Sequence, residues 1–95
     1  MFAVAGQWTL DVGRTDQQRA ALDGIVAGVR QLPGFVRGFW SRDATDPTVN
    51  LTYIVFEQRD QAESFMRAVA ANAPAQTASG VSRGELRLVE IVADA

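Results

Sequence analysis

The chain has 95 residues, of which 47% are hydrophobic and 21% charged, and its formal net charge is −2. This balance is typical of a globular protein and excludes a disordered or collagen-like chain. The length corresponds to a single domain over residues 1–95. The slightly acidic charge gives no general attraction to phosphate backbones or anionic lipid, so we expect neither a nucleic-acid partner nor a membrane partner.

Three residue types that often carry catalysis are missing. The sequence contains no Cys and no His, and all nine of its basic residues are Arg. Without Cys there is no disulfide, thiolate nucleophile or iron–sulfur ligand, and without His the usual haem ligand, zinc ligand and neutral-pH base are absent. Without Lys no Schiff base can form. We therefore expect no metal and no cofactor.

The first predicted elements are a strand and a helix. Apolar residues on alternate positions from Phe2 to Val12 predict the strand. It begins without the basic segment and apolar run of a signal peptide, so we expect a cytoplasmic protein. Thr15 and Gln18 have the spacing of a capping box and predict a helix start at Thr15. The helix carries an apolar stripe before Pro33-Gly34, formed by Leu22, Ile25, Val26, Val29 and Leu32.

The next two predicted strands form a hairpin. They cover Phe35 to Arg42 and Val49 to Glu57, and a turn cluster joins them. Asp43 and Asp46 lie in this turn, where we expect them to cap it rather than to act as general bases. The second of these strands is apolar on both parities, so we expect neither of its faces to be wet.

A second helix is predicted to begin at Asp60, with Glu63 three residues on. Its buried stripe before Pro74 consists of Ala62, Phe65, Met66, Val69, Ala70 and Ala73. The segment Pro74 to Gly84 shows no periodicity and is expected to be a loop. Glu85 to Ala93 is the last predicted strand, and it is again apolar on both parities.

The element order β-α-β-β-α-β predicts a ferredoxin-like α+β fold with a four-stranded antiparallel sheet. Right-handed crossovers place both helices on one face of that sheet. The other face is left bare although strands three and four carry apolar residues on both sides. We therefore expect a homodimer in which two sheets pack face to face around a two-fold axis.

The sequence resembles a known family over most of its length. The resemblance is carried by Leu32-Pro33-Gly34-Phe35, Gly38-Phe39-Trp40, Tyr53-Ile54-Val55-Phe56-Glu57 and Gln61-Ala62-Glu63-Ser64-Phe65. The family comprises the dimeric α/β-barrel proteins related to antibiotic biosynthesis monooxygenases. It includes cofactor-free enzymes that oxidise polycyclic phenols to quinones, haem-degrading enzymes and small-molecule isomerases, so the fold implied by the resemblance does not settle the activity.

The haem-degrading branch of the family implies an Asn in the first strand, a Trp at the end of the third strand and a His on the second helix. This sequence has Gln7 or Trp8 at the first place, Phe56 at the second and no His at all. Because the iron ligand is missing, we reject haem degradation.

The quinone-forming branch implies a pocket between the sheet and the helices. Candidate pocket residues are Trp8, Trp40, Asn50, Phe56 and Phe65. By resemblance, the strand parity of Phe56 faces the helices, which places Tyr53 on the partner side. The alternative for each residue is a role in the core or interface, where large aromatics are common. Asn50 differs, because a buried amide needs a partner, so it is either exposed at the strand end or part of a polar site.

Two functions stay open on the sequence. In the first, the barrel binds a small aromatic or apolar molecule and oxygenates it without a cofactor. In the second, side chains fill the interior and the protein is a non-catalytic binding or assembly module. An enclosed space of a few hundred Å³ would favour the first. We expect Arg37, Arg42 and Arg87 to form ion pairs at the rim with Glu57, Glu85 or Glu90.

Overall fold

A computed structural model describes residues 1–78 and 80–95. Its main elements are β1 (Phe2–Leu10), α1 (Thr15–Val29), β2 (Phe35–Arg42), β3 (Val49–Phe56), α2 (Arg59–Ala71) and β4 (Val81–Glu90). A 3-10 turn, η1 (Val12–Arg14), precedes α1, and a short helix, α3 (Ala73–Ala78), follows α2. The four strands form one sheet in the order β2-β3-β1-β4, and every neighbouring pair is antiparallel. The ferredoxin-like prediction is confirmed.

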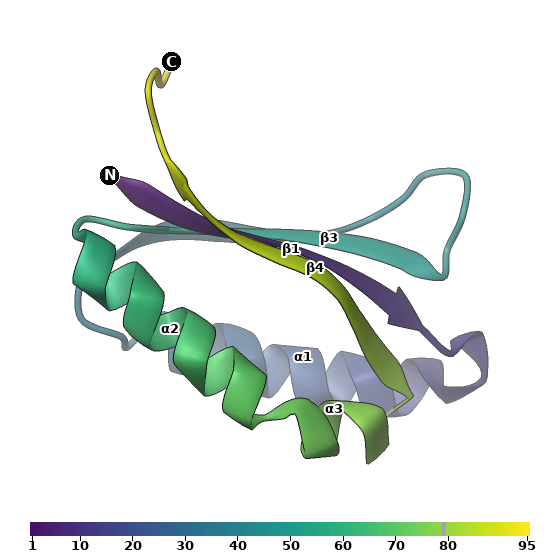
Figure 1. Ribbon diagram of the computed structural model, residues 1–95. Coiled ribbons are helices and arrows are strands. Elements are labelled where there is room, and N and C mark those ends of the chain that lie inside the picture. Colours follow the sequence, from purple (N-terminus) through teal and green to yellow (C-terminus); the bar gives the residue numbers. More distant parts are fainter. Residues whose placement is uncertain (79) are drawn as a thin grey trace.

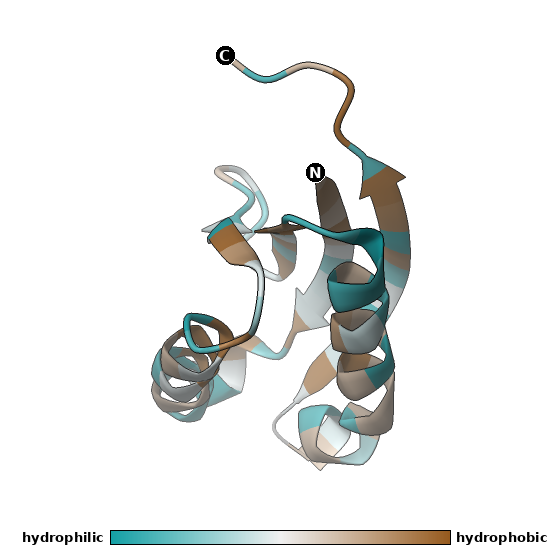
Figure 2. Cartoon of the chain, turned by 90° about the vertical axis from the view of Figure 1, so that its left-hand side faces the viewer, coloured by the Kyte–Doolittle hydropathy of each residue, from teal (hydrophilic) through white to brown (hydrophobic). Residues whose placement is uncertain are grey.

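The helices all lie below the sheet in Figure 1, and in Figure 2 α1 and α2 lie side by side on that same face. The C-terminal residues leave the sheet on the opposite side. This arrangement follows from right-handed crossovers, which bring each helix back over the same face of the sheet.

The core lies between the sheet and the helices. Val4 of β1 and Ile54 and Phe56 of β3 pack there against Val29 of α1 and Ala62 of α2. Strand residues with the same parity therefore face the helices, as period-two alternation requires. The expected orientation of β3 is confirmed, because Leu51, on the other parity, is 46% exposed.

The start of the first helix differs from the predicted capping box. The chain turns earlier than expected, because Asp11 caps η1 and accepts a hydrogen bond from the amide of Gly13. Thr15 is then already helical, and its hydroxyl donates to the carbonyl of Val12 at 2.8 Å instead of accepting an amide. Gln18 does reach back, but its amide donates to the carbonyl of Asp11.

The second helix also begins differently from the prediction. Gln58, rather than Asp60, is the N-cap, and Gln58 and Gln61 form a reciprocal capping box. Glu63 is paired with Arg59 at 2.8 Å and takes no part in the cap. The backbone amide of Gln58 donates to Oε1 of Gln61, as it would to the carboxylate of a Glu in a capping box.

The predicted loop from Pro74 to Gly84 is wrong for most of its length. Residues 73–78 form α3, and β4 begins at Val81 and ends at Glu90 rather than running from Glu85 to Ala93. Pro74 is compatible with α3 because proline is tolerated in the first turn of a helix, where amides lack intrahelical partners. Residue 79 of the predicted loop lies outside the described residues.

The sheet face opposite the helices carries exposed apolar residues. Phe39 is 55% exposed and stacks on Tyr53 with ring centroids 5.7 Å apart, next to Leu51 on the neighbouring strand. The expectation that neither face of β3 is wet therefore does not hold within one chain. Helices cover one face only. On the other face Val55 and Ala3 are buried, whereas Leu51 and Phe39 remain open to solvent.

Candidate functional site

Polar side chains gather on the helix-facing side of the sheet, toward the ends of β1 and β3 that are remote from Phe56. The indole Nε1 of Trp8 donates a hydrogen bond to the hydroxyl of Thr52 at 3.1 Å. Gly6 lies beneath this contact, and a Cβ there would be 3.0 Å from both bonded atoms. The missing side chain of Gly6 therefore makes room for the indole to lie across the strands.

Asn50 is the neighbour of Trp8 across the β1/β3 ladder and of Arg42 across the β2/β3 ladder. Its Nδ2 is buried and has no hydrogen-bond partner. An unpaired buried amide group costs about 1–3 kcal/mol, so native proteins rarely keep one without a reason. In this structure the atom is therefore an unsatisfied donor within the layer.

Trp40 joins the same group from β2, where it lies opposite Thr52 on β3. It packs partly buried against the hydrophobic core. Three of the five predicted pocket residues, Trp8, Trp40 and Asn50, are therefore on adjacent strands and on one face. We call these three residues together with Thr52 the polar cluster.

The other two predicted pocket residues lie elsewhere. Phe56 is six residues from Asn50 on the same strand, which corresponds to roughly 20 Å along an extended chain. It is 1% exposed, and its ring centroid lies 5.5 Å from that of Phe65 on α2. These two rings belong to the packed end of the core, so the structure does not bring all five candidates together.

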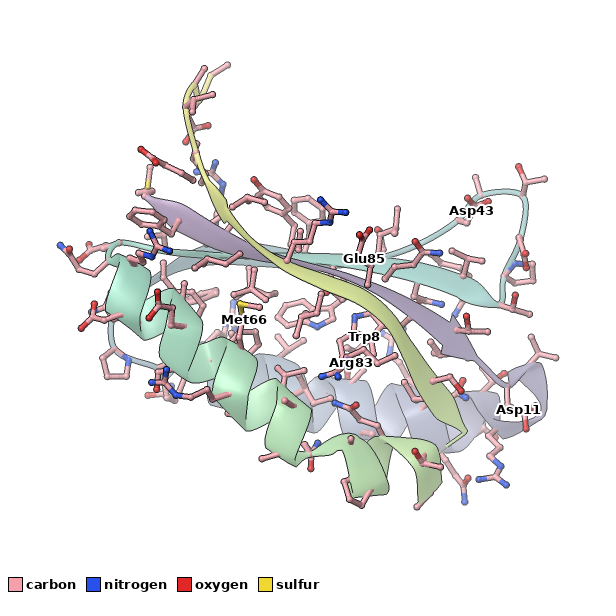
Figure 3. The ribbon with its side chains drawn as sticks, viewed as in Figure 1. Trp8, Asp11, Asp43, Met66, Arg83 and Glu85 are labelled. Atoms are coloured by element: carbon pink, nitrogen blue, oxygen red, sulfur yellow. The ribbon has the colours of Figure 1, made fainter. Side chains whose placement is uncertain are left out.

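A groove beside the polar cluster was not anticipated. It lies between α2 and β4, has a volume of about 360 Å³, and is lined by Met66, Arg67, Ala70, Arg83, Gly84 and Leu86. Figure 3 shows Met66, Trp8 and Arg83 between the sheet and the helices, whereas Glu85 projects from the opposite face. We call this space the α2/β4 groove. It is open to solvent, and none of the five predicted residues lines it.

The groove was missed because residues 81–84 were expected to be a loop. A β-bulge makes their strand irregular: Gly6 pairs with Leu86, but Trp8 pairs with Arg83, so β4 has one extra residue in this interval. A bulge shifts the alternation of side chains along the strand. The available signal was Gly84, since a glycine within a strand is typical of a bulge.

A second hollow of about 350 Å³ is formed by consecutive residues 12–17 at the start of α1. It belongs to the surface of a single turn, and none of the residues of the polar cluster lines it.

The acidic residues of the β2/β3 turn have the predicted structural role. Asp43 accepts hydrogen bonds from the amides of Asp46 and Thr45. Both bonds lower the pKa of its carboxyl group, and the bond from Asp46 has the larger effect. Asp46 accepts from the amide and the hydroxyl of Thr48. Hydrogen bonds to the ionised form favour it, which suits a turn cap and not a general base at neutral pH.

The predicted rim ion pairs are found only in part. Arg87 pairs with Glu85 on the same strand. Arg37 pairs instead with Asp94 of the C-terminal segment at 2.9 Å. Among the described residues, Arg42 makes no ion pair.

Residues 1–78 and 80–95 contain no group of three or more potential metal-ligating side chains of the His, Cys, Asp or Glu type. In that same part of the chain, no helix has both the length and the apolar character needed to cross a membrane.

A four-stranded antiparallel sheet with helices on one face, carrying aromatic and amide side chains between the layers, defines a ferredoxin-like α+β protein. The chain belongs to the antibiotic biosynthesis monooxygenase family, whose model matches residues 1–80. No curated protein sequence matches the chain.

Several solved structures are similar to this chain over nearly its whole length. A protein from Deinococcus radiodurans assigned to the same family has 17% identity, covers 100% of this chain and 95% of its own, and gives a TM-score of 0.77. SnoaB, a cofactor-independent oxygenase from Streptomyces nogalater, has 20% identity, with 98% and 94% of the two chains covered and a TM-score of 0.75. These similarities establish the fold.

The haem-degrader MhuD from Mycobacterium tuberculosis is also similar, with 15% identity, 100% and 99% of the two chains covered and a TM-score of 0.75. Its structure holds two haems in the active site. In the present chain, α2 turns Ala62, Phe65 and Met66 toward the sheet, and the sequence has no His. These residues do not fit a haem held by an imidazole, so we derive no step through haem.

Proposed function

We propose that this protein binds a small aromatic or apolar molecule at the polar cluster and oxygenates it without a cofactor. The observation that carries the proposal is the buried, unpaired Nδ2 of Asn50 beside the indoles of Trp8 and Trp40. Indole faces bind flat apolar rings, and an amide donor selects a ring that carries an oxygen. Family membership supports the same assignment.

The chemistry requires no group that the chain lacks. When an electron-rich phenol reacts with O₂, a ring methylene becomes a carbonyl. One oxygen atom enters the product, and the other leaves as water with the two hydrogens. The substrate supplies the four electrons, so neither a metal nor a flavin is needed for the balance. The amide of Asn50 would stabilise the negative charge that develops on the phenol oxygen as its proton is lost.

The competing function is a non-catalytic binding or assembly module. It is favoured by the packed end of the core, where Phe56 is buried and in contact with Phe65. Under this alternative the hydrogen bond between Trp8 and Thr52 only stabilises the core. The unpaired Nδ2 of Asn50 then has no functional role. The two functions differ in whether aromatic ligands bind at all.

The test is oxygen consumption with an anthrone-type phenol. We expect turnover by the native protein and a loss of about 2–4 kcal/mol of transition-state stabilisation in Asn50→Ala, comparable with removal of an oxyanion donor. Asn72→Ala is the matched control, because it makes the same change at an exposed position at the end of α2. Native turnover no faster than the buffer blank contradicts the enzymatic part of the proposal.

We propose further that the protein is a single-domain homodimer with its open sheet faces in contact. Support comes from the exposed Phe39 and Leu51 and from the stack of Phe39 on Tyr53, which form an apolar surface without helices above it. Monomers rarely leave such a patch uncovered. A cytoplasmic location is part of the same proposal, since a chain without Cys does not depend on an oxidising compartment.

Sedimentation tests the dimer. The native protein should sediment at twice the 10.3 kDa mass of the chain, and Leu51→Glu should sediment as a monomer because a charge cannot be buried unpaired at the interface. Gln31→Glu, an exposed residue that follows α1 on the helical side, is the control and should remain dimeric. A native protein of monomer mass at micromolar concentration would overturn the dimer.

A further inference from the structure

The α2/β4 groove combines an apolar floor with two arginines. Met66 from α2 and Leu86 from β4 are half-buried in it, while Arg67 and Arg83 stand exposed at its walls. The groove adjoins the polar cluster, because Leu86 and the indole of Trp8 both approach the vacant Cβ position of Gly6, to 3.2 Å and 3.0 Å. A molecule lying on Leu86 would therefore extend toward Trp8.

Neither arginine of the groove is neutralised. Among the described residues, Arg67 and Arg83 make no hydrogen bond or ion pair. The nearest carboxylates in sequence are engaged elsewhere: Glu63 pairs with Arg59, and Glu85 pairs with Arg87 on the other side of the sheet. Because the chain as a whole has a net charge of −2, this positive groove is a local feature and not part of a basic surface.

The bulge in β4 is what brings Arg83 to this side. From Phe2 to Gly6, β1 and β4 pair in a regular register that would place Gly84 opposite Trp8 and turn Arg83 to the open face. The extra residue shifts the register, so that Arg83 becomes the partner of Trp8 and faces the helices. Gly84 permits the shift, since a Cβ there would lie 3.1 Å from the carbonyl oxygen of Gln7.

We propose that Arg67 and Arg83 hold the carboxylate of an aromatic acid whose ring system lies on Met66 and Leu86 and reaches Trp8. This proposal rests on the proposed function and names its substrate class: an aromatic molecule with an anionic group at one end. A guanidinium presents a planar fork of donors that matches a carboxylate, and such charge-assisted hydrogen bonds are stronger than neutral ones. The two guanidinium groups lie on opposite walls of the groove, and neither is paired with a protein carboxylate. A ligand carboxylate can therefore bind between them.

The test is calorimetric titration with a matched pair of probes, 2-naphthoate and 2-naphthamide, which share a ring system and differ in charge. We expect the native protein to bind the naphthoate roughly tenfold more tightly or better. In the double variant Arg67→Gln, Arg83→Gln this preference should fall below about twofold while the naphthamide affinity is kept. Arg30→Gln, which removes an exposed and unpaired arginine at the end of α1, should retain the preference.

The outcomes separate this proposal from the proposed function. Equal affinity of the native protein for both probes overturns the aromatic acid and leaves aromatic binding standing. A preference for naphthoate that survives in the double variant overturns the assignment to the α2/β4 groove. Binding of neither probe overturns both proposals together. Thermal unfolding of each variant verifies that the substituted proteins are folded.

Discussion

The two ends of the helix-facing side of the sheet are built from the same strands but differ in how tightly they are closed. At one end Phe56 is buried against Phe65 and Ala62, and Val29 at the end of α1 is 5% exposed. At the other end lie the Trp8 and Thr52 pair and the unpaired amide of Asn50. Ile25, one turn before Val29 on the same helix stripe, is 46% exposed.

The connections between helices and strands also differ at the two ends. At the packed end, the chain passes from α1 to β2 through Gly34, whose carbonyl accepts from the amide of Glu57 at 2.9 Å, and α2 starts directly after β3. At the polar end, η1 lies between β1 and α1, and the longer connection from α2 to β4 contains α3. A core can be complete at one end of a sheet while the other end keeps room for a ligand.

The strongest test of this comparison is Phe56→Ala. Truncating a fully buried aromatic side chain should cost about 3–5 kcal/mol of unfolding free energy. Ile25→Ala should cost less than about 1 kcal/mol, because that side chain is half exposed and alanine is the better helix former. Urea unfolding measures both. Similar losses in the two variants would contradict the difference in packing between the ends.

Gly34→Ala tests the link at the packed end. Gly34 has a φ of +78°, and its Cβ would fall 1.7 Å from Oε1 of Gln61. The left-handed backbone alone should cost about 1–2 kcal/mol, and displacing Gln61 from the α2 capping box should add roughly 1 kcal/mol. Chemical denaturation measures the loss.

The control for this change is Gly24→Ala, in the middle of α1, where a Cβ would meet nothing within 4 Å. It should stabilise the protein by about 1 kcal/mol, since alanine favours the helix. A loss of stability in Gly24→Ala would show that α1 is more closely packed than the structure indicates.

At the polar end, Asn50→Leu should separate stability from function. The substitution removes a buried donor that has no partner, so the unfolding free energy should stay within about 1 kcal/mol of the native value or rise. Oxygen consumption with an anthrone-type phenol should be lost. The idea fails if stability falls by several kcal/mol, since Asn50 would then be a satisfied structural residue.

The smallest effect is expected at Asp43, in the turn that joins the strands of the polar end. Hydrogen bonds from the amides of Asp46 and Thr45 lower the pKa of Asp43 below 3.8, so its ionised form is favoured in the folded state. This contribution is present above pH 3.8 and is lost as pH falls through the lowered pKa. Asp43→Asn should therefore flatten the decline of the melting temperature between neutral and strongly acidic pH. An unchanged dependence of the melting temperature on pH would show that the Asp43 carboxylate does not contribute to stability.

The fold could be predicted from the sequence because period-two and helical patterns are local properties of the residues. The limits of β2 were predicted at Phe35 and Arg42, and the parity of β3 was predicted as observed. The first helix starts at Thr15 as predicted, and the second starts at Arg59, one residue earlier than predicted. The caps were not predicted, because Asp11 caps the preceding 3-10 turn and Gln58 caps α2. Which of several competent residues becomes the cap depends on where the preceding strand leaves the sheet.

The candidate site was predicted only in part for a related reason. The resemblance placed the strand parity of Asn50 and Phe56 on the helix-facing side, and the strand register brings Trp8 and Trp40 to the same face as Asn50. Phe56 also faces the helices, but the sequence did not show that it is buried in the packed end of the core. The distance between two points on a strand follows from the sequence, but the separation of helices and sheet at each point does not.

The sequence by itself determined the order of the four strands and the two long helices and the absence of His, Cys and Lys chemistry. Only the tertiary structure decided that Arg83 faces the helices and borders a groove with Arg67. The reason is the bulge, which arises from the pairing of β4 with β1. A one-residue shift in a ladder moves a side chain to the other face, and Gly84 signals a bulge in β4 without fixing how the strand pairs with β1.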